Sequence, residues 1–267
     1  MGVNKGAIMP RQGVFEKMDI QRLFYSSLRF GLHSGLLLLY PPRCLLCASP
    51  GQADRDLCGH CHQSLPFNQT ACVHCALPLP AGTSSIAVCG RCQKKTPLYD
   101  HAFSVFSYEQ PVIWLIQQLK FNEKLAHARL LGELLASADC VKRIGVDGDD
   151  ICLLPVPLYK KRLSQRGFNQ SIELARALSK KTGWPMELKS VQRIRDTSAQ
   201  TGLDAKARRK NIRGAFEVVD ALPYKQVVII DDVVTTGSTV NELSRVLKKS
   251  GVERITVLSL ARAPLNK

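Results

Sequence analysis

The sequence has no hydrophobic run long enough to cross a membrane. The apolar run at residues 36–39 is followed by Pro41 and Pro42, and it is far shorter than the roughly 20 residues that a spanning helix needs. No stretch has the pattern of a secretory signal. We therefore expect a cytoplasmic protein that is not transmembrane, in a reducing compartment where thiols bind metal ions rather than form disulfides.

Acidic and aromatic residues are both scarce. Asp and Glu number 22 against 37 Lys and Arg, which leaves a net charge of +15, and Phe, Trp and Tyr make up only 6% of the chain. The positive charge favours polyanionic partners, whether nucleic acid, phosphorylated substrates or anionic lipid heads. Because aromatic residues are few, single-stranded DNA would be bound mainly through its phosphate backbone rather than by base stacking.

Composition divides the chain into three stretches. Residues 1–40 predict a loose tail followed by an amphipathic or buried helix over residues 20–40, for which contact with a membrane surface is the lesser alternative. Residues 41–96 are rich in Cys, Gly, Pro and His and lack aliphatic periodicity. Residues 98–267 alternate apolar strands with helices, which predicts an α/β domain.

Eight of the ten cysteines form four Cys-x-x-Cys pairs. Two residues between cysteines let a tight turn aim both sulfurs at one ion, and four thiolates complete the tetrahedral coordination of Zn²⁺. Sequential grouping gives two closed, structural zinc sites of the zinc-ribbon kind, and interleaved grouping is the alternative. The predicted ligands are Cys44, Cys47, Cys58 and Cys61 in one site, and Cys72, Cys75, Cys89 and Cys92 in the other.

Thiol–disulfide chemistry is the competing interpretation, since a single Cys-x-x-Cys pair can be a redox site. Four copies in a loop-rich segment make redox chemistry the weaker interpretation. We treat His60, His62 and His74 as bystanders, because cysteines already fill both tetrahedra. Cys140 and Cys152 stand apart from the pairs and are expected to be ordinary buried cysteines.

Hydrophobic periodicity predicts the elements of the third stretch. Strands are expected at residues 102–108, 151–154, 227–230 and 255–260, and helices at residues 111–121, 126–138, 168–181 and 237–249. The continuous β-branched run at residues 227–230 is typical of a strand covered on both faces. The last strand, turn, helix and strand form one parallel crossover unit.

The turn after residue 230 carries the most specific pattern. Two acids, Asp231 and Asp232, follow the apolar run, and a hydroxyl-rich turn then opens a helix. The turn residues are Thr235, Thr236, Gly237, Ser238 and Thr239. Backbone N–H groups at a helix N-terminus, together with hydroxyls, form a phosphate cradle, and adjacent carboxylates suit a vicinal diol. An ordinary helix cap would explain Thr236 or Ser238 but not the acids, and a Walker loop is excluded because Gly-Lys-Ser/Thr is missing.

Basic residues concentrate between positions 155 and 215, with fifteen Lys and Arg against four Asp and Glu. Lys160, Lys161, Arg162 and Arg166 follow one strand, and Arg193, Arg195 and further Lys and Arg up to Arg213 surround a polar segment, residues 196–211, that we expect to be a mobile loop. Such residues would clamp a pyrophosphate or follow a nucleic-acid backbone, although a solvated charged surface explains part of them.

Four motifs together resemble those of the ComF/GntX family over residues 41–265. They are the Cys pairs, Arg166-Gly167-Phe168-Asn169-Gln170, Gln200-Thr201-Gly202-Leu203, and the Asp-Asp-Val-Val-Thr-Thr-Gly turn. The resemblance implies a type I phosphoribosyltransferase-like parallel sheet with flanking helices, preceded by a double zinc ribbon. It implies that Asp231 and Asp232 hold the ribose hydroxyls as catalytic residues, that the turn grips the 5-phosphate, that residues 155–157 line the pyrophosphate side, and that the basic loop closes over it.

The resemblance implies binding of phosphoribosyl pyrophosphate with Mg²⁺ and a role in natural competence and the uptake or utilisation of DNA. Phosphoribosyl transfer and non-catalytic binding of single-stranded DNA are both open, and competence-machinery proteins are candidate partners. A nucleotide-salvage phosphoribosyltransferase is a further alternative. The purine-salvage subtype is disfavoured, because Thr235 stands where that subtype often has an Asp.

Overall fold

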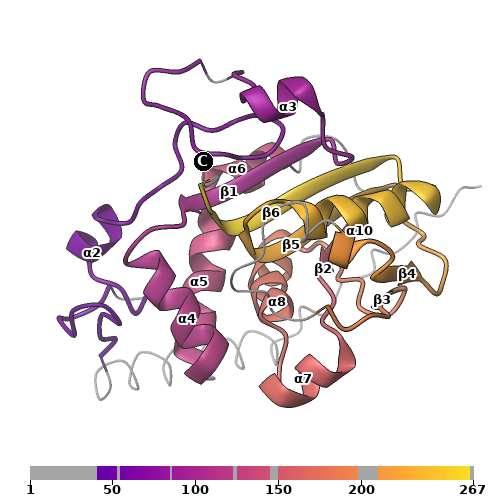
Figure 1. The fold of residues 1–267 in the computed structure, drawn as a ribbon. Coiled ribbons are helices and arrows are strands. Elements are labelled where there is room, and N and C mark those ends of the chain that lie inside the picture. The colour runs from indigo at the N-terminus through magenta and orange to yellow at the C-terminus, as the bar shows by residue number, and fades with distance from the viewer. Residues whose placement is uncertain are drawn as a thin grey trace, which may run out of the picture.

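The computed structural model describes residues 41–264 (Figure 1). The exceptions are residues 53–54, 85, 123–124, 145–149 and 198–209, and the side chains of residues 120–125. The predicted helix at residues 20–40, the motif at residues 200–203 and most of the predicted mobile loop lie outside the described residues. No described helix combines the length and hydropathy needed to span a membrane.

A four-stranded parallel sheet forms the centre of the fold (Figure 1). Its order is β1 (His101–Ser107), β6 (Arg254–Arg262), β5 (Gln226–Val234) and β2 (Ile151–Pro155). All five residues of β2 are buried, as are eight of the nine in β6. Burial on both faces explains why these strands are largely apolar in the sequence. The predicted parallel sheet is confirmed.

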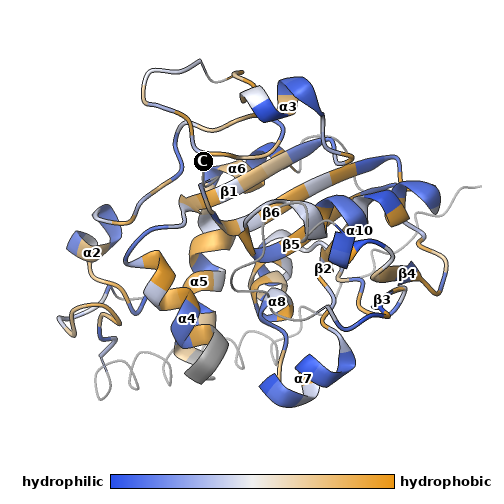
Figure 2. Ribbon diagram, viewed as in Figure 1, coloured by the Kyte–Doolittle hydropathy of each residue, from blue (hydrophilic) through white to orange (hydrophobic). Residues whose placement is uncertain are grey.

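Helices cover both faces of the sheet. Side chains alternate between the two faces along β5. Val228 and Ile230 pack in the core beneath α5 (Leu125–Ser137) and α8 (Gln170–Thr182). Val227 and Ile229 pack in the core beneath α10 (Ser238–Lys249). Figures 1 and 2 show α10 on one face, with its hydrophilic side turned outward, and α5 and α8 on the other. α4 (Val112–Asn122), α6 (Asp139–Ile144) and α7 (Lys160–Arg166) complete this part.

Helix α8 illustrates how local sequence sets an element. Asn169 caps its first turn by accepting a 3.0 Å hydrogen bond from the Ser171 N–H, and Gly183 ends it in the left-handed conformation. The helix approaches α5 closely because Gly132 has no side chain: a Cβ there would lie 2.6 Å from the Ala177 Cβ. The cap explains why α8 begins at Gln170 rather than at residue 168.

Two strands were not predicted. β3 (Val191–Arg193) and β4 (Phe216–Val218) form a short antiparallel pair, with β4 next to α10. Each has only three residues, too few to show a hydrophobic period.

The expectation that Cys140 is buried was wrong, since the end of α5 and the short helix α6 leave it half-buried. Cys152, in the all-buried strand β2, is fully buried.

The Cys-rich segment packs directly against the sheet domain. Leu57 and Leu65 are buried in the same core as Leu115 of α4. Phe67 forms an antiparallel bridge with Phe106 of β1, and their ring centroids lie 5.1 Å apart. The segment is therefore part of one packed body; its predicted limits, residues 41–96, stay a prediction.

Candidate functional site

The eight paired cysteines come together as two clusters in sequential order. Within each cluster the four Sγ atoms lie within 4.8 Å of one another. The Sγ–Sγ distances are 3.7 Å between Cys47 and Cys58 and 3.6 Å between Cys75 and Cys89. A tetrahedral Zn²⁺ with bonds of about 2.3 Å requires sulfurs ~3.8 Å apart, so both clusters fit the ion. The clusters are consistent with two structural zinc sites, and the grouping is sequential rather than interleaved.

The two clusters share one local design. In each, the first pair lies on a tight turn whose next residue is a left-handed alanine, Ala48 with φ 61° and Ala76 with φ 54°. The second pair lies at the start of a short helix, α2 (Gly59–Gln63) or α3 (Gly90–Lys94). Alanine in this conformation costs about 1–2 kcal/mol, a cost that metal coordination is able to offset. The repeat supports two equivalent metal sites.

Backbone N–H groups and burial complete each cluster. The N–H of Cys61 donates to Cys58 Sγ at 3.4 Å, and that of Cys89 donates to Cys72 Sγ at 3.3 Å. Burial, followed by the charges of neighbouring thiolates, raises the pKa of Cys75 to about 11. Thiolates packed this closely require a cation among them. No disulfide joins any of the ten cysteines, and the clusters contain no histidine.

The predicted phosphate turn joins β5 to α10. Gly237 is the N-cap residue of α10, with φ 73°, and has no side chain with which to cap the helix. Thr236 Oγ1 and Ser238 Oγ are hydrogen-bonded to each other at 2.8 Å, and the Ser238 N–H donates to Thr236 Oγ1 at 3.3 Å. The N-terminal N–H groups of α10 and these hydroxyls therefore gather at one place, which we call the cradle (residues 235–239). This arrangement suits a phosphate.

The two acids lie within β5, because the ladder to β6 continues through them: Asp231 is paired with Ser259 and Val234 with Arg262. Both residues are half-buried. Oδ1 of Asp231 accepts from the Asp232 N–H at 2.9 Å, and Oδ1 of Asp232 accepts from the Val233 N–H at 2.8 Å. These hydrogen bonds orient both carboxylates just before the cradle, at the carboxyl end of a central parallel strand, where open α/β sheets bind ligands.

Arg162 and Arg193 meet at Thr197. Burial and the nearby charge of Arg162 lower the pKa of Arg193 to about 10, and the charge of Asp231 opposes that shift. Arg193 donates to Thr197 Oγ1, and Arg162 donates to the Thr197 carbonyl at 2.6 Å. Paired guanidinium groups suit a diphosphate. The basic composition marked both residues, but their shared contact with Thr197 required the fold.

The Arg-Gly-Phe-Asn-Gln motif supports the neighbouring loop. Asn169 donates from Nδ2 to the Val156 carbonyl at 3.0 Å, and the Val156 N–H donates to the Ile230 carbonyl at 2.9 Å. The loop after β2 is thereby held against β5, immediately before the acids. This gives the motif a structural role that its sequence alone did not reveal.

Arg262 is a further residue of the site, which no sequence motif marks. It is 1% exposed, at the end of β6. Nε donates to the Cys75 carbonyl at 2.9 Å, and Nη1 donates to the carbonyls of Val234 at 3.0 Å, of Ala263 at 2.7 Å and of Thr235. One side chain thus connects the second Cys cluster to the cradle. An arginine ending a buried apolar strand was the only sequence signal.

Two domain families match the chain. Residues 35–96 match the double zinc ribbon domain, and residues 169–265 match the phosphoribosyl transferase domain. Competence protein F of Haemophilus influenzae (strain ATCC 51907 / DSM 11121 / KW20 / Rd) is 37% identical over 229 residues, which cover 83% of this chain and 97% of that protein. The chain belongs to the ComF/GntX family.

Other ComF/GntX relatives agree with this assignment. The DNA utilization protein YhgH of Escherichia coli (strain K12) is 34% identical over 229 residues, covering 85% of this chain and 99% of that protein. Competence protein ComFC of Bacillus subtilis (strain 168) is 24% identical over 226 residues, covering 78% of this chain and 89% of that protein. The ComF/GntX chain thus combines a double zinc ribbon with a phosphoribosyltransferase-like parallel sheet, as its motifs predicted.

Proposed function

We propose that the protein binds phosphoribosyl pyrophosphate, or a related ribose 5-phosphate, at the cradle and acts in natural competence and the uptake or utilisation of DNA. The observation that carries this proposal is the hydroxyl-lined start of α10, with glycine as its N-cap residue, shortly after two acids on the central strand. The match of residues 169–265 to the phosphoribosyl transferase domain supports the ligand. The names of the relatives, competence protein F and DNA utilization protein, support the process.

Each part of the site has a role in this proposal. The cradle N–H groups and hydroxyls hold the 5-phosphate, and the carboxylates of Asp231 and Asp232 accept hydrogen bonds from the ribose hydroxyls. Carboxylate oxygens are the ligands that Mg²⁺ prefers, so these acids also fit the ion, which would neutralise the diphosphate when bound. Arg162 and Arg193 face the pyrophosphate side, where negative charge increases as that group leaves.

The reaction that this arrangement supports is phosphoribosyl transfer to a nitrogen nucleophile. The bond from the anomeric carbon to the pyrophosphate oxygen breaks, the oxygen keeps the electron pair, and a new carbon–nitrogen bond forms. The acids stabilise positive charge on the sugar, and the arginines stabilise the leaving pyrophosphate.

Isothermal titration with phosphoribosyl pyrophosphate and Mg²⁺ tests the binding. Asp231→Asn should raise Kd roughly tenfold to a hundredfold, because one charge-assisted hydrogen bond is worth about 1.5–3 kcal/mol. Asp139→Asn is the matched control, since Asp139 is exposed on α6 and pairs only with Lys142 at 3.0 Å among the described residues. No heat with the unmodified protein, or equal affinity in both variants, would exclude the proposed site.

The second candidate is a single-stranded-DNA-binding factor that uses the same site without turnover, alone or with competence-machinery proteins. The net charge of +15 and the cations around the cradle favour it. Release of pyrophosphate in the presence of candidate nitrogen acceptors separates the two. Turnover that disappears in Asp231→Asn supports the enzyme, whereas ligand binding without pyrophosphate release across acceptors supports the binding factor.

A further inference from the structure

A cleft of about 770 Å³ separates the second zinc ribbon from α10, and the cradle forms part of its wall. The ribbon side consists of Cys75, Cys92 and the segment from α3 to Tyr99. The opposite side consists of Thr236, Gly237 and Ser238 of the cradle, followed by Asn241, Glu242 and Arg245 of α10. The volume suits a ligand much larger than one phosphate group. Whatever the cradle holds is therefore adjacent to an open space beyond the phosphate.

The cleft is strongly cationic. Six cationic side chains line it against a single carboxylate: Arg91, Lys94, Lys95, Arg213, Arg245 and Arg262 against Glu242. The three on the ribbon, Arg91, Lys94 and Lys95, are exposed. Within the described part of the chain they form no ion pair. Their charges are available to an anion in the cleft.

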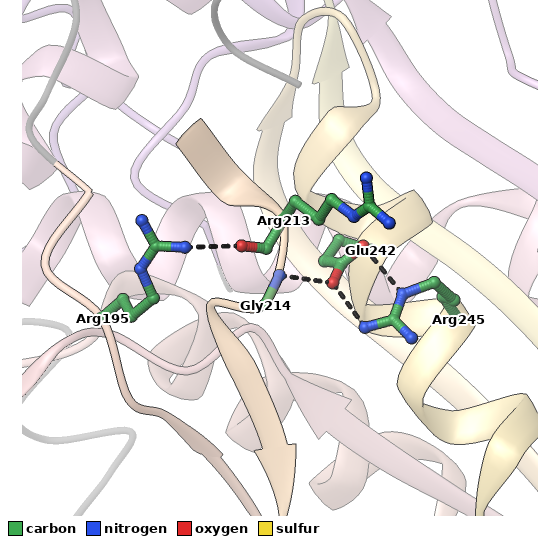
Figure 3. A network of polar contacts seen from close by, with 5 residues as sticks. All are labelled: Arg195, Arg213, Gly214, Glu242 and Arg245. Atoms are coloured by element: carbon green, nitrogen blue, oxygen red, sulfur yellow. Dashed lines mark hydrogen bonds and ion pairs between the residues drawn. The ribbon is translucent and has the colours of Figure 1, made fainter. Parts of the chain in front are cut away.

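The one carboxylate organises the opposite wall. Glu242 accepts from Arg245 Nε at 3.0 Å and Nη2 at 2.7 Å, and from the Gly214 N–H at 2.8 Å (Figure 3). Arg195 donates to the Arg213 carbonyl at 2.8 Å, which fixes the same backbone from its other side. Figure 3 shows the Arg213 side chain beside Glu242, on the side where Arg245 also lies. Glu242 thus holds Arg245 and the backbone next to Arg213 in place.

We propose that the cradle accepts a phosphodiester, with the next nucleotide of a single strand lying against the ribbon residues Arg91, Lys94 and Lys95. A terminal 5-phosphate needs only the cradle, and the ribbon cations would have no role in binding it. A substituent on that phosphate enters the cleft, where its own phosphate meets these cations. The inference rests on the proposed function, because the cradle supplies the first phosphate site.

A competing role for these cations is to balance the second Cys cluster, which with Zn²⁺ carries a net charge of −2 from four thiolates. Lys94 is the last residue of α3 and Lys95 follows it as the C-cap, so both lie near Cys92. The two roles differ in what the lysines stabilise. In the competing role their reversal releases zinc, whereas in the proposed role zinc stays bound and the strand is lost.

The test uses the full chain with zinc bound and three probes: ribose 5-phosphate, a single-stranded oligothymidylate, and the same oligonucleotide as a duplex. The variant is Lys94→Glu with Lys95→Glu. Its matched control is Lys180→Glu with Lys181→Glu, an adjacent exposed pair on α8 that changes the net charge equally. Zinc content is measured for each protein, and strand affinity is measured against salt.

The expected result has three parts. The Lys94/Lys95 variant keeps its zinc and its ribose 5-phosphate affinity and loses at least tenfold in single-strand affinity. The slope of log K against log salt concentration becomes shallower by about 1.4, since each phosphate contact on a single strand contributes about 0.7. The Lys180/Lys181 control changes strand affinity less than threefold. The unmodified protein prefers the single strand to the duplex.

Four results would overturn the inference. Equal losses in both variants would mean that only net charge attracts the strand, and unchanged strand affinity in the Lys94/Lys95 variant would mean that the cleft is not used. Zinc loss in that variant would assign the lysines to the metal site. If the unmodified protein binds the strand but not ribose 5-phosphate, the proposed function fails as well. If one of the first three results is found while the unmodified protein binds ribose 5-phosphate, the inference alone has failed.

Discussion

Arg262→Met should weaken the second metal site and the cradle together. Methionine keeps most of the buried volume but removes every hydrogen bond that Arg262 donates to the carbonyls of Cys75, Val234, Thr235 and Ala263. The Val234 carbonyl keeps the Ala263 N–H at 3.0 Å, so the Cys75 carbonyl is among those most affected. One or two carbonyls left without a hydrogen bond, at about 1–3 kcal/mol each, predict a loss of about 1–6 kcal/mol in unfolding free energy.

The assays are urea unfolding, zinc release to a chromophoric chelator, and binding of ribose 5-phosphate. The variant should release one of its two zinc equivalents faster than the unmodified protein and bind the ligand more weakly. Arg176→Met is the control, because Arg176 is an exposed residue of α8 paired with Glu173 at 2.6 Å, and such pairs contribute about 0–1 kcal/mol. If Arg262→Met matched this control in all three assays, the coupling that we derive from Arg262 would be wrong.

Three further predictions follow from the same contacts. Native mass spectrometry should give two zinc ions per chain, whereas an apo mass with all eight paired thiols alkylatable would contradict the metal sites. Gly237→Ala should lower Tm by about 2–8 °C, because alanine at φ 73° costs about 1–2 kcal/mol while its Cβ would lie an unstrained 3.6 Å from Tyr99 Oη; an unchanged Tm would refute this. Partial burial tends to raise the pKa of Glu242, but its hydrogen bonds to Arg245 and the Gly214 N–H outweigh burial and lower the pKa. Its stabilising contribution is therefore present above its unfolded-state pKa and disappears as pH falls through the lowered value, so Glu242→Gln should flatten that acid dependence in pH-dependent unfolding.

The sequence by itself determined the features that depend on local spacing. Two residues between cysteines and a repeated turn made the two clusters predictable, because a Cys-x-x-Cys pair sets its own geometry. Apolar patterns marked all four strands of the parallel sheet: alternation marked β1, and short apolar runs, as burial on both faces requires, marked the others. The turn at residues 235–239 was recognisable because glycine, hydroxyls and a helix start within five residues form a cradle without distant partners.

Tertiary structure alone decided what lies between distant segments. β5 extends through Asp231 and Asp232 because β6 supplies a hydrogen-bonding partner at Ser259, which the apolar pattern does not encode. The contact of Arg262 with Cys75 joins residues 187 positions apart, and the cleft exists because the second ribbon packs beside α10. Local patterns fix elements and ligand sets, whereas the docking of one segment on another depends on packing that no short stretch of sequence contains.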